Sequence, residues 1–264
     1  MDNELGYSIC SSKSSIHVTQ EDIDHYQLHG YVVLTRGLTR SQLNALHEEA
    51  DILTNHLITE QVDLVHDLGC IIEPLTCGYL DPPSTLDYKI HSAEYRKRRN
   101  AILETNDETS PATIVLETIA RLAAELICPD NPKTVYLLNE QYIIKPPQTA
   151  SYSQFAWHRD SDYLDPSLQN ESSVACWTAL DPVNCKNGSL LLGDIKDNGS
   201  GKGNGVSLDL PAGSIVFMSN RLLHKSTGNA SALFRRVFMP QYSLKPFYDT
   251  EKAGYVGLAI KCSF

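Results

Sequence analysis

The sequence lacks long apolar runs, and it lacks an excess of positive charge. Its 264 residues carry 22 Lys and Arg against 32 Asp and Glu, for a formal net charge of −10. No apolar stretch approaches the roughly 20 residues that cross a bilayer, and residues 1–15 have no apolar core of the kind found in signal peptides. Nucleic acids and anionic membranes both bind basic patches, so we expect neither as a partner.

Paired cysteine motifs are also missing. The seven cysteines are odd in number and include no Cys-x-x-Cys, which argues against a disulfide framework and against a zinc cage. We therefore expect reduced thiols in a cytoplasmic protein. A hydrophobic share of 42% with 20% charged residues excludes a disordered chain. The length fits either two domains or one large β-domain.

The first half of the chain has the patterns of helices. A helix is predicted over residues 19–28, where Thr19 is the N-cap, and a buried strand follows over residues 31–34. Ser41 is the expected N-cap of a second helix. An apolar stripe at helical spacing predicts a third helix over residues 111–127.

Short β-rich segments follow Pro132. They alternate with Gly, Pro, Asn and Asp, which indicates an antiparallel sandwich or barrel. Helices first and strands afterwards predict an α+β fold that is mainly β, with helices packed on a β-core. The predicted strands cover residues 135–144, 174–180, 189–192, 206–210, 214–218 and 236–242.

A His-x-Asp motif at His158 and Asp160 is the first sign of a metal site. Residues two apart on an extended backbone point to the same side, so the imidazole and the carboxylate can bind one ion. The motif by itself is common and needs a third ligand, for which His224 is the candidate. Two His and one carboxylate on one side of an ion form the facial triad of non-haem Fe(II) oxygenases, which leaves positions open for a co-substrate and dioxygen.

Arg235 strengthens this interpretation. It lies eleven residues after His224, beyond a turn at Gly228-Asn229, on what we expect to be the returning strand of a hairpin. Such a hairpin would bring the two side chains close together. Arg offers a rigid bidentate fork for a carboxylate, and an iron site beside a carboxylate receptor is what a 2-oxo-dicarboxylic acid requires.

With these residues in place, the chain resembles the phytanoyl-CoA dioxygenase family of Fe(II)/2-oxoglutarate oxygenases. The resemblance departs from the family at Gly193-Asp194-Ile195-Lys196, where the family carries Pro-Gly-Ser-His. The matching segments are residues 19–34, 38–41, 145–147, 157–160, 176–181, 187–190 and 210–213, with His224, Ser226, Asn229, Arg235 and Arg236.

The resemblance implies a fold, a reaction and the main site residues. The fold is a double-stranded β-helix (jelly-roll or cupin-like) core over about residues 133–245 with flanking N-terminal helices, in a single domain over residues 1–264. The cofactors are Fe(II), 2-oxoglutarate as co-substrate, and O2. His158, Asp160 and His224 would bind the iron, and Arg235 would bind the far carboxylate of 2-oxoglutarate.

Four further residues are implied at the cofactor pocket, on weaker grounds: Ser226, Trp177, Gln141 and Lys145. A turn hydroxyl is the alternative for Ser226, and core packing is the alternative for Trp177. Strand alternation places Gln141 and Lys145 on one side of their strand. Arg236 is expected to point away from Arg235 and to be structural.

The substrate is the least determined part. Tyr79, Tyr88 and Tyr163 are the candidate substrate-binding residues, and their aromatic character favours a fairly apolar small molecule, such as a specialised metabolite. An amino acid or another small polar metabolite is the alternative. A metal-dependent lyase or isomerase and a noncatalytic partner subunit also stay open, as do a homodimer and a heterodimer.

Overall fold

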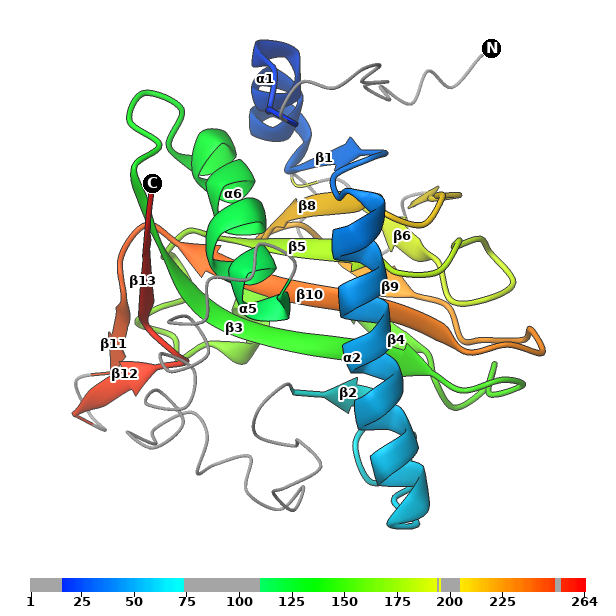
Figure 1. Ribbon diagram of the computed structural model, residues 1–264. Helices are drawn as coiled ribbons and strands as arrows, with labels where there is room; N and C mark the ends of the chain where they lie inside the picture. Colours follow the sequence, from blue (N-terminus) through cyan, green and yellow to red (C-terminus); the bar gives the residue numbers. More distant parts are fainter. Residues whose placement is uncertain (1–15, 74–109, 194, 196–204, 250–252) are drawn as a thin grey trace.

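Two antiparallel β-sheets face each other, and helices cover the outer face of the larger sheet (Figure 1). The computed structural model describes residues 16–73, 110–193, 195, 205–249 and 253–264. The strands are β1 (Tyr31–Leu34), β2 (Ile71–Ile72), β3 (Thr134–Lys145), β4 (Phe155–His158), β5 (Ser173–Ala179), β6 (Leu190–Leu192), β7 (Val206–Ser207), β8 (Ile215–Ser219), β9 (His224–Ser226), β10 (Arg235–Ser243), β11 (Phe247–Asp249), β12 (Gly254–Val256) and β13 (Ile260–Ser263).

Apart from β6 and β7, which pair with each other in the smaller sheet, consecutive strands from β3 to β10 alternate between the two sheets. The larger sheet has the order β1-β8-β5-β10-β3-β13, with β2 paired to β3, and the smaller sheet has the order β4-β9-β6-β7. From β3 to β10 the chain therefore crosses repeatedly from one sheet to the other. This winding is the double-stranded β-helix that the sequence resemblance implied. A separate hairpin of β11 and β12 follows.

Alternation along the larger sheet produces two apolar layers. Trp177 of β5 and Met218 of β8 point inward and pack against the smaller sheet. Their neighbours Cys176 and Phe217 point outward and pack beneath the helices. Because successive side chains of a strand point to opposite faces, this sheet is buried on both sides. All seven residues of β5 are buried, which explains why β5 reads as a continuous apolar run.

Helices α1 and α2 each begin at a capping box. In α1 (Gln20–His29), the Thr19 side chain caps the helix and Asp22 returns the bond. In α2 (Arg40–Thr59), the prediction of Ser41 as N-cap is wrong, because Thr39 is the N-cap. The Gln42 side chain accepts a hydrogen bond from the Thr39 backbone N–H at 3.0 Å, and only Thr39 has a Glu or Gln three residues later.

The predicted helix over residues 111–127 is a continuous helical segment in three parts. They are α5 (Pro111–Thr113), the π-helix η2 (Ile114–Ile119) and α6 (Ala120–Ile127). The wider π-turns bury Ile114, Val115, Leu116 and Ile119 together against the larger sheet. Within the described part of the chain, none of the helices combines the length and the apolar character that crossing a bilayer requires.

The expected hairpin between His224 and Arg235 does not form. β9 pairs with β4 and β6 in the smaller sheet, whereas β10 pairs with β3 and β5 in the larger sheet. His224 and Arg235 therefore belong to opposite walls of the sandwich. The turn at residues 228–229 carries the chain across from one sheet to the other. The two residues lie around one interior because the sheets face each other, not because their strands are neighbours.

Candidate metal centre and co-substrate pocket

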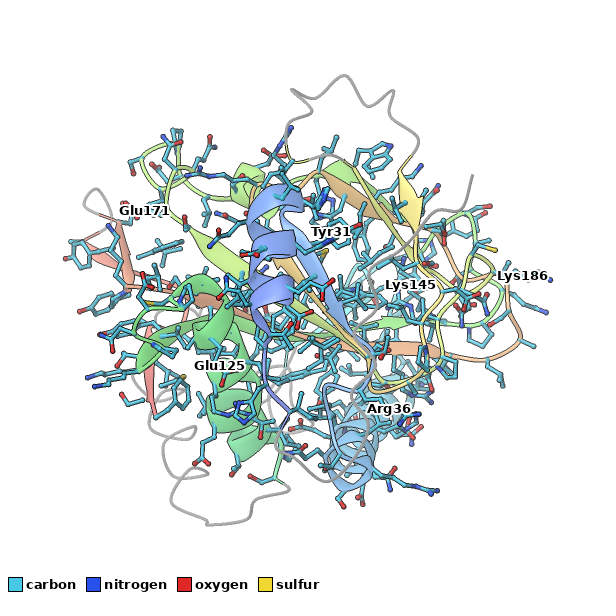
Figure 2. The ribbon with its side chains drawn as sticks, turned by 90° about the horizontal axis from the view of Figure 1, so that it is seen from above. Tyr31, Arg36, Glu125, Lys145, Glu171 and Lys186 are labelled. Atoms are coloured by element: carbon cyan, nitrogen blue, oxygen red, sulfur yellow. The ribbon has the colours of Figure 1, made fainter. Side chains whose placement is uncertain are left out.

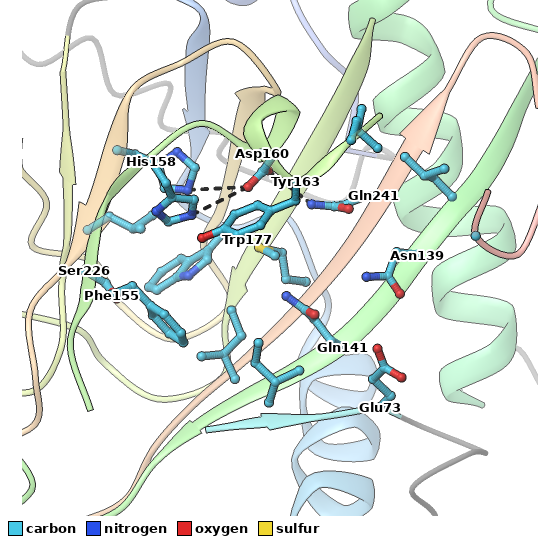
Figure 3. A pocket seen from close by; sticks show the side chains of 18 of the residues that line it. Glu73, Asn139, Gln141, Phe155, His158, Asp160, Tyr163, Trp177, Ser226 and Gln241 are labelled. Carbon is cyan, nitrogen blue, oxygen red and sulfur yellow. Dashed lines mark hydrogen bonds and ion pairs between the residues drawn. The ribbon is translucent and has the colours of Figure 1, made fainter. Parts of the chain in front are cut away.

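Three potential metal ligands meet at one edge of the smaller sheet (Figure 3). His158 ends β4 and lies directly opposite His224, which begins β9. Asp160 begins the short 3-10 helix η3 (Asp160–Tyr163), one extended residue after His158. Asp160 Oδ1 is 3.8 Å from His158 Nε2 and 3.7 Å from His224 Nε2. The three ligand atoms all lie within 4.8 Å of one another.

Backbone carbonyls set the orientation of both imidazole rings. His158 Nδ1 is 2.8 Å from the Ala156 carbonyl oxygen, and His224 Nδ1 is 3.0 Å from the Leu222 carbonyl oxygen. A carbonyl only accepts, so each Nδ1 donates its hydrogen and each Nε2 offers a lone pair beside Asp160. Burial, followed by the neighbouring His224, lowers the pKa of His158, which favours the neutral form that binds metals. This donor set fits Fe(II).

A cavity of about 470 Å³ opens beside the three ligands. Its volume is in the range of pockets that hold small molecules. Apolar side chains make up most of its wall. The side-chain amides of Asn139, Gln141 and Gln241 line one side, which we call the cavity floor (Figure 3). The lining residues are Ile71, Glu73, Leu138, Asn139, Gln141, Ile143, Phe155, His158, Asp160, Tyr163, Leu164, Trp177, Leu190, His224, Ser226, Met239, Gln241, Val256 and Gly257.

Two buried basic side chains, which are cations when protonated, lie behind one end of this cavity. Arg235 of β10 and Lys145 of β3 are directly opposite each other across the two strands, and both are fully buried. Figure 2 contrasts Lys145, inside the sandwich, with the exposed Lys186 at the periphery. Among the described residues, neither Arg235 nor Lys145 has a carboxylate within ion-pair distance. Burial lowers the pKa of Arg235 to about 10, and burial followed by the Arg235 charge lowers the pKa of Lys145 to about 6.

The Arg235 guanidinium has unused hydrogen-bond donors. Its Nη1 donates to the Ile143 carbonyl oxygen at 3.3 Å, but the buried Nε and Nη2 have no acceptor among the described residues. Two unpaired N–H groups on a buried cation match the geometry of a carboxylate. The donor pattern therefore fits the far carboxylate of 2-oxoglutarate. A dianion would supply a negative charge that no described residue places within ion-pair distance of Arg235 or Lys145.

Ser226, Trp177 and Gly188 enclose these cations. Lys145 Nζ donates to Ser226 Oγ at 2.6 Å, and the Arg235 guanidinium lies 5.6 Å from the centre of the Trp177 ring. A Cβ atom on Gly188 would lie 2.9 Å from Lys145 Cδ and 3.1 Å from Arg235 Nε. Gly188 also has φ = +105°. Glycine is thus required there for both backbone conformation and space.

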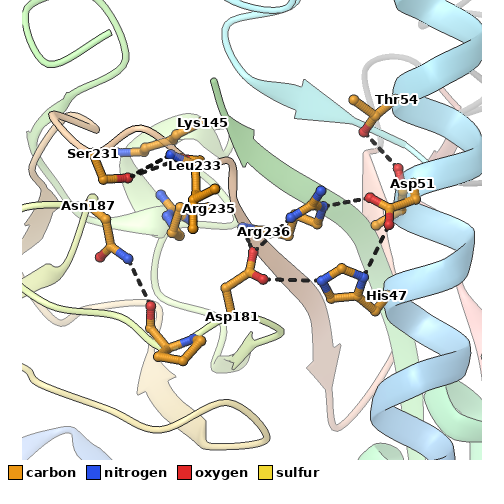
Figure 4. Close-up of polar contacts among 12 residues, drawn as sticks. His47, Asp51, Thr54, Lys145, Asp181, Asn187, Ser231, Leu233, Arg235 and Arg236 are labelled. Carbon is orange, nitrogen blue, oxygen red and sulfur yellow. Dashed lines mark hydrogen bonds and ion pairs between the residues drawn. The ribbon is translucent and has the colours of Figure 1, made fainter. Parts of the chain in front are cut away.

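Arg236 points away from Arg235 and forms a separate polar network (Figure 4). Its guanidinium is 2.7 Å from Asp51 of α2 and 3.2 Å from Asp181. His47 lies between the same two carboxylates, at 3.3 Å and 3.1 Å. The network ties α2 to the start of β10 and to the segment that follows β5, two neighbouring strands in the middle of the larger sheet. The structural role that the sequence suggested for Arg236 agrees with these contacts.

The other predicted site residues fall into three groups. Gln141, Trp177, Ser226 and Tyr163 line the cavity, with Tyr163 at its mouth, 77% exposed and 5.5 Å from the His158 ring centre. Lys145 lies behind the cavity wall. Tyr79 and Tyr88, two of the three candidate substrate-binding residues, lie outside the described residues.

Sequence reasoning missed the amide and apolar residues of the cavity floor, above all Asn139, Met239 and Gln241. Side chains alternate along a strand, so an inward Arg235 predicts that residues 239 and 241 of β10 also point inward. This signal was available in the sequence. The same signal was available for Asn139, because residues 139, 141, 143 and 145 share one face of β3 and the register shift between Gln241 and Tyr242 lies beyond Asn139. The register shift is a bulge at Leu138, and side chains before it alternate in the opposite sense. Asn139 therefore points inward while Leu137, two residues away, points outward.

Comparison with known proteins agrees with the fold and shows the family. The family model described as phytanoyl-CoA dioxygenase (PhyH) matches residues 26–192, which is more than half of the chain. No curated protein sequence matches the chain.

Several solved structures share the fold. The 2-oxoglutarate-dependent epimerase SnoN from nogalamycin biosynthesis is 18% identical, covering 86% of this chain and 83% of its own, with a TM-score of 0.59. AviO1 from Streptomyces viridochromogenes is 19% identical, with coverages of 88% and 96% and a TM-score of 0.58. EvdO2 from Micromonospora carbonacea, complexed with 2-oxoglutarate, is 16% identical, with coverages of 90% and 96% and a TM-score of 0.59. At these identities the likeness establishes the common double-stranded β-helix fold.

Proposed function

Since the chain belongs to the phytanoyl-CoA dioxygenase (PhyH) family, we propose that it oxidises a C–H bond of a small organic molecule and releases succinate and CO2. It is an Fe(II)/2-oxoglutarate-dependent dioxygenase, with O2 as the oxidant. The single observation that carries the proposal is the pairing of two sites around one cavity. A His-Asp-His group lies on one wall. Arg235 and Lys145, both buried and without a carboxylate partner among the described residues, lie behind the adjoining end.

Each part of this arrangement has a role in the proposed reaction. His158, Asp160 and His224 bind Fe(II), which supplies the activation of O2 when it is bound. Arg235 binds the far carboxylate of 2-oxoglutarate through Nε and Nη2. Ser226 and Lys145 hold the same end of the co-substrate, and Trp177 packs against the guanidinium. Gln141 faces the middle of the cavity floor and is a further candidate for the co-substrate.

The walls of the cavity support a mainly apolar substrate. Away from the cations, Leu138, Leu164 and Val256 line it, and Tyr163 stands at the mouth. Among the described lining residues there is no Lys or Arg, so nothing on this part of the wall favours a phosphorylated or acyl-CoA substrate.

We therefore infer a neutral, largely apolar specialised metabolite. The structural relative SnoN comes from nogalamycin biosynthesis, which is consistent with this substrate class. The main outcomes for the substrate are hydroxylation, desaturation or an oxidative rearrangement. An amino-acid substrate is disfavoured because the described part of the wall offers no cation besides the co-substrate pair for a second carboxylate.

Anaerobic titration tests the core of the proposal. Fe(II) is added to the purified protein, 2-oxoglutarate follows, and the weak visible absorbance of the iron–2-oxoglutarate complex is recorded. We expect a saturable band that Asp160→Ala abolishes. Lys225→Met is the matched control, because Lys225 of β9 lies next to His224 but packs on the Trp157 ring at 5.0 Å, outside the cavity.

A second measurement tests the reaction. A panel of neutral polycyclic metabolites and a panel of amino acids are supplied with O2, and succinate release above the substrate-free rate is measured. Stimulation by members of the first panel supports the substrate class, and stimulation by amino acids alone overturns it. If the wild-type protein shows no band with Fe(II) and 2-oxoglutarate, the proposed function itself fails.

A further inference from the structure

The two oxygen atoms of Asp160 have different surroundings. Oδ1 lies 3.8 Å and 3.7 Å from the Nε2 atoms of His158 and His224. Oδ2 accepts a hydrogen bond from Gln241 Nε2 at 3.1 Å (Figure 3). An ionised carboxylate only accepts hydrogen bonds, so the amide nitrogen is the group that Gln241 must present to it. One oxygen is thus directed toward the metal position, and the other is held away from it.

We propose that Gln241 is a positioning residue that keeps Asp160 a monodentate ligand through Oδ1. A carboxylate whose second oxygen is free can bind an ion with both oxygens, which would occupy one more coordination position. The facial triad needs its remaining positions for the co-substrate and O2. By holding Oδ2, Gln241 preserves those positions. This inference rests on the proposed function and adds a residue that neither the His-x-Asp motif nor its spacing contains.

The position of Gln241 in the sheet suits this role. Gln241 lies on β10, between β3 and β5, where its partners are Asn139 and Ala175. A strand paired on both sides has little freedom to move. Arg235 projects inward from the same strand, so β10 carries both the co-substrate cation and the amide that orients the metal-binding carboxylate. A single rigid strand therefore aligns the two halves of the site.

The contact cannot be explained as routine satisfaction of a buried amide. Gln241 lines the cavity, where water is available to its amide, and does not lie in the closed core. Asn139, its cross-strand partner, lines the same cavity but bonds locally, since its Oδ1 accepts from the Glu140 backbone N–H at 2.8 Å. Of these two adjacent amides, only Gln241 contacts a member of the metal-binding group. Asn139 is for this reason the matched control.

Co(II) is the probe for the test, because its visible spectrum reports coordination number and geometry. Affinity for Co(II) and the spectrum of the complex are measured for the wild type, Gln241→Met, Gln241→Leu and Asn139→Leu, and each apo protein is also unfolded thermally. Methionine matches the length of glutamine without its donor. Partners that orient metal ligands are typically worth 10- to 100-fold in metal affinity, so we expect that loss in both Gln241 variants, with an altered spectrum.

The controls separate positioning from general damage. Asn139→Leu is expected to keep the wild-type Co(II) affinity and spectrum, and Gln241→Met is expected to unfold as a cooperative protein near the wild-type temperature. The inference is overturned if both Gln241 variants bind Co(II) within twofold of the wild type with an unchanged spectrum, or if Asn139→Leu loses as much affinity. Failure of the wild type to bind Co(II) at all would instead count against the proposed function.

Discussion

Arg235→Met should separate co-substrate binding from folding. Arg235 is fully buried and lacks a carboxylate partner among the described residues, with Nε and Nη2 unpaired. Burial lowers the pKa of Arg235 to about 10. This shift corresponds to a free-energy cost of roughly 3 kcal/mol for keeping the side chain charged inside the protein. Methionine removes that cost and fills much of the same volume, so we expect the ligand-free variant to unfold at or slightly above the wild-type temperature.

The same substitution should strongly weaken 2-oxoglutarate binding. Truncating one partner of a buried, hydrogen-bonded charge pair costs about 2–5 kcal/mol. Lys145 remains opposite position 235, and losing the Arg235 charge removes one of the causes that lower its pKa. Lys145 will therefore offset part of the loss. We expect a net loss of about 2–3 kcal/mol of binding free energy, which raises the Kd of 2-oxoglutarate roughly 30- to 150-fold.

Arg236→Met is the matched control on the neighbouring residue. Arg236 binds Asp51 and Asp181 outside the cavity, so its loss should lower the free energy of unfolding by about 1–2 kcal/mol and leave the Kd of 2-oxoglutarate within about threefold. Anaerobic titration with Fe(II) gives the Kd, and calorimetry gives the unfolding temperature. If Arg235→Met binds 2-oxoglutarate like the wild type, or if it is the less stable of the two variants, the assignment of Arg235 is refuted.

Three further predictions concern the same end of the cavity. Lys145, whose pKa is lowered to about 6, is mostly neutral at pH 7–8, and a bound dianion favours its charged form. Binding of 2-oxoglutarate should therefore take up a proton, and its affinity should fall by up to tenfold from pH 7 to pH 8. Calorimetry in two buffers would measure the proton uptake, and Lys145→Met should remove it. Gly188→Ala should weaken 2-oxoglutarate binding about tenfold, because the new Cβ would press on Lys145 and Arg235; a free-enzyme Kd equal to wild type would contradict this. Removing metal with a chelator should weaken 2-oxoglutarate binding at least tenfold. The affinity that remains should be abolished by Arg235→Met. Tryptophan fluorescence can follow binding, since Trp177 lies at the pocket.

Local patterns were sufficient for the helices and for the longer strands. The capping box at Thr19 and the apolar stripe over residues 111–127 predicted helical segments that the structure contains. The inward face of β3, with Gln141 and Lys145 on one side and Tyr142 on the other, also follows from alternation alone. In each case the information lies within a few residues, because a helix or strand repeats its own side-chain geometry over a short distance.

Short strands were not predictable in the same way. β4 has four residues and β9 has three, too few for a period to be recognised. The prediction that Arg235 returns on a hairpin from His224 failed for this reason. Nothing near the Gly228-Asn229 turn records that the chain leaves one sheet for the other. That choice depends on which faces must be buried against each other.

The sequence by itself determined the chemistry of this protein, and the tertiary structure decided its geometry. A His-x-Asp motif, a later His and a following Arg, together with the family resemblance, predicted an Fe(II) and dicarboxylate site, because these side chains supply the ligands and the charge that such a site needs. Only the folded sandwich places His224 opposite His158, buries Arg235 beside Lys145 with no carboxylate partner among the described residues, and turns Gln241 toward Asp160. These contacts join residues distant in the chain through packing between two sheets, and no local pattern encodes such packing.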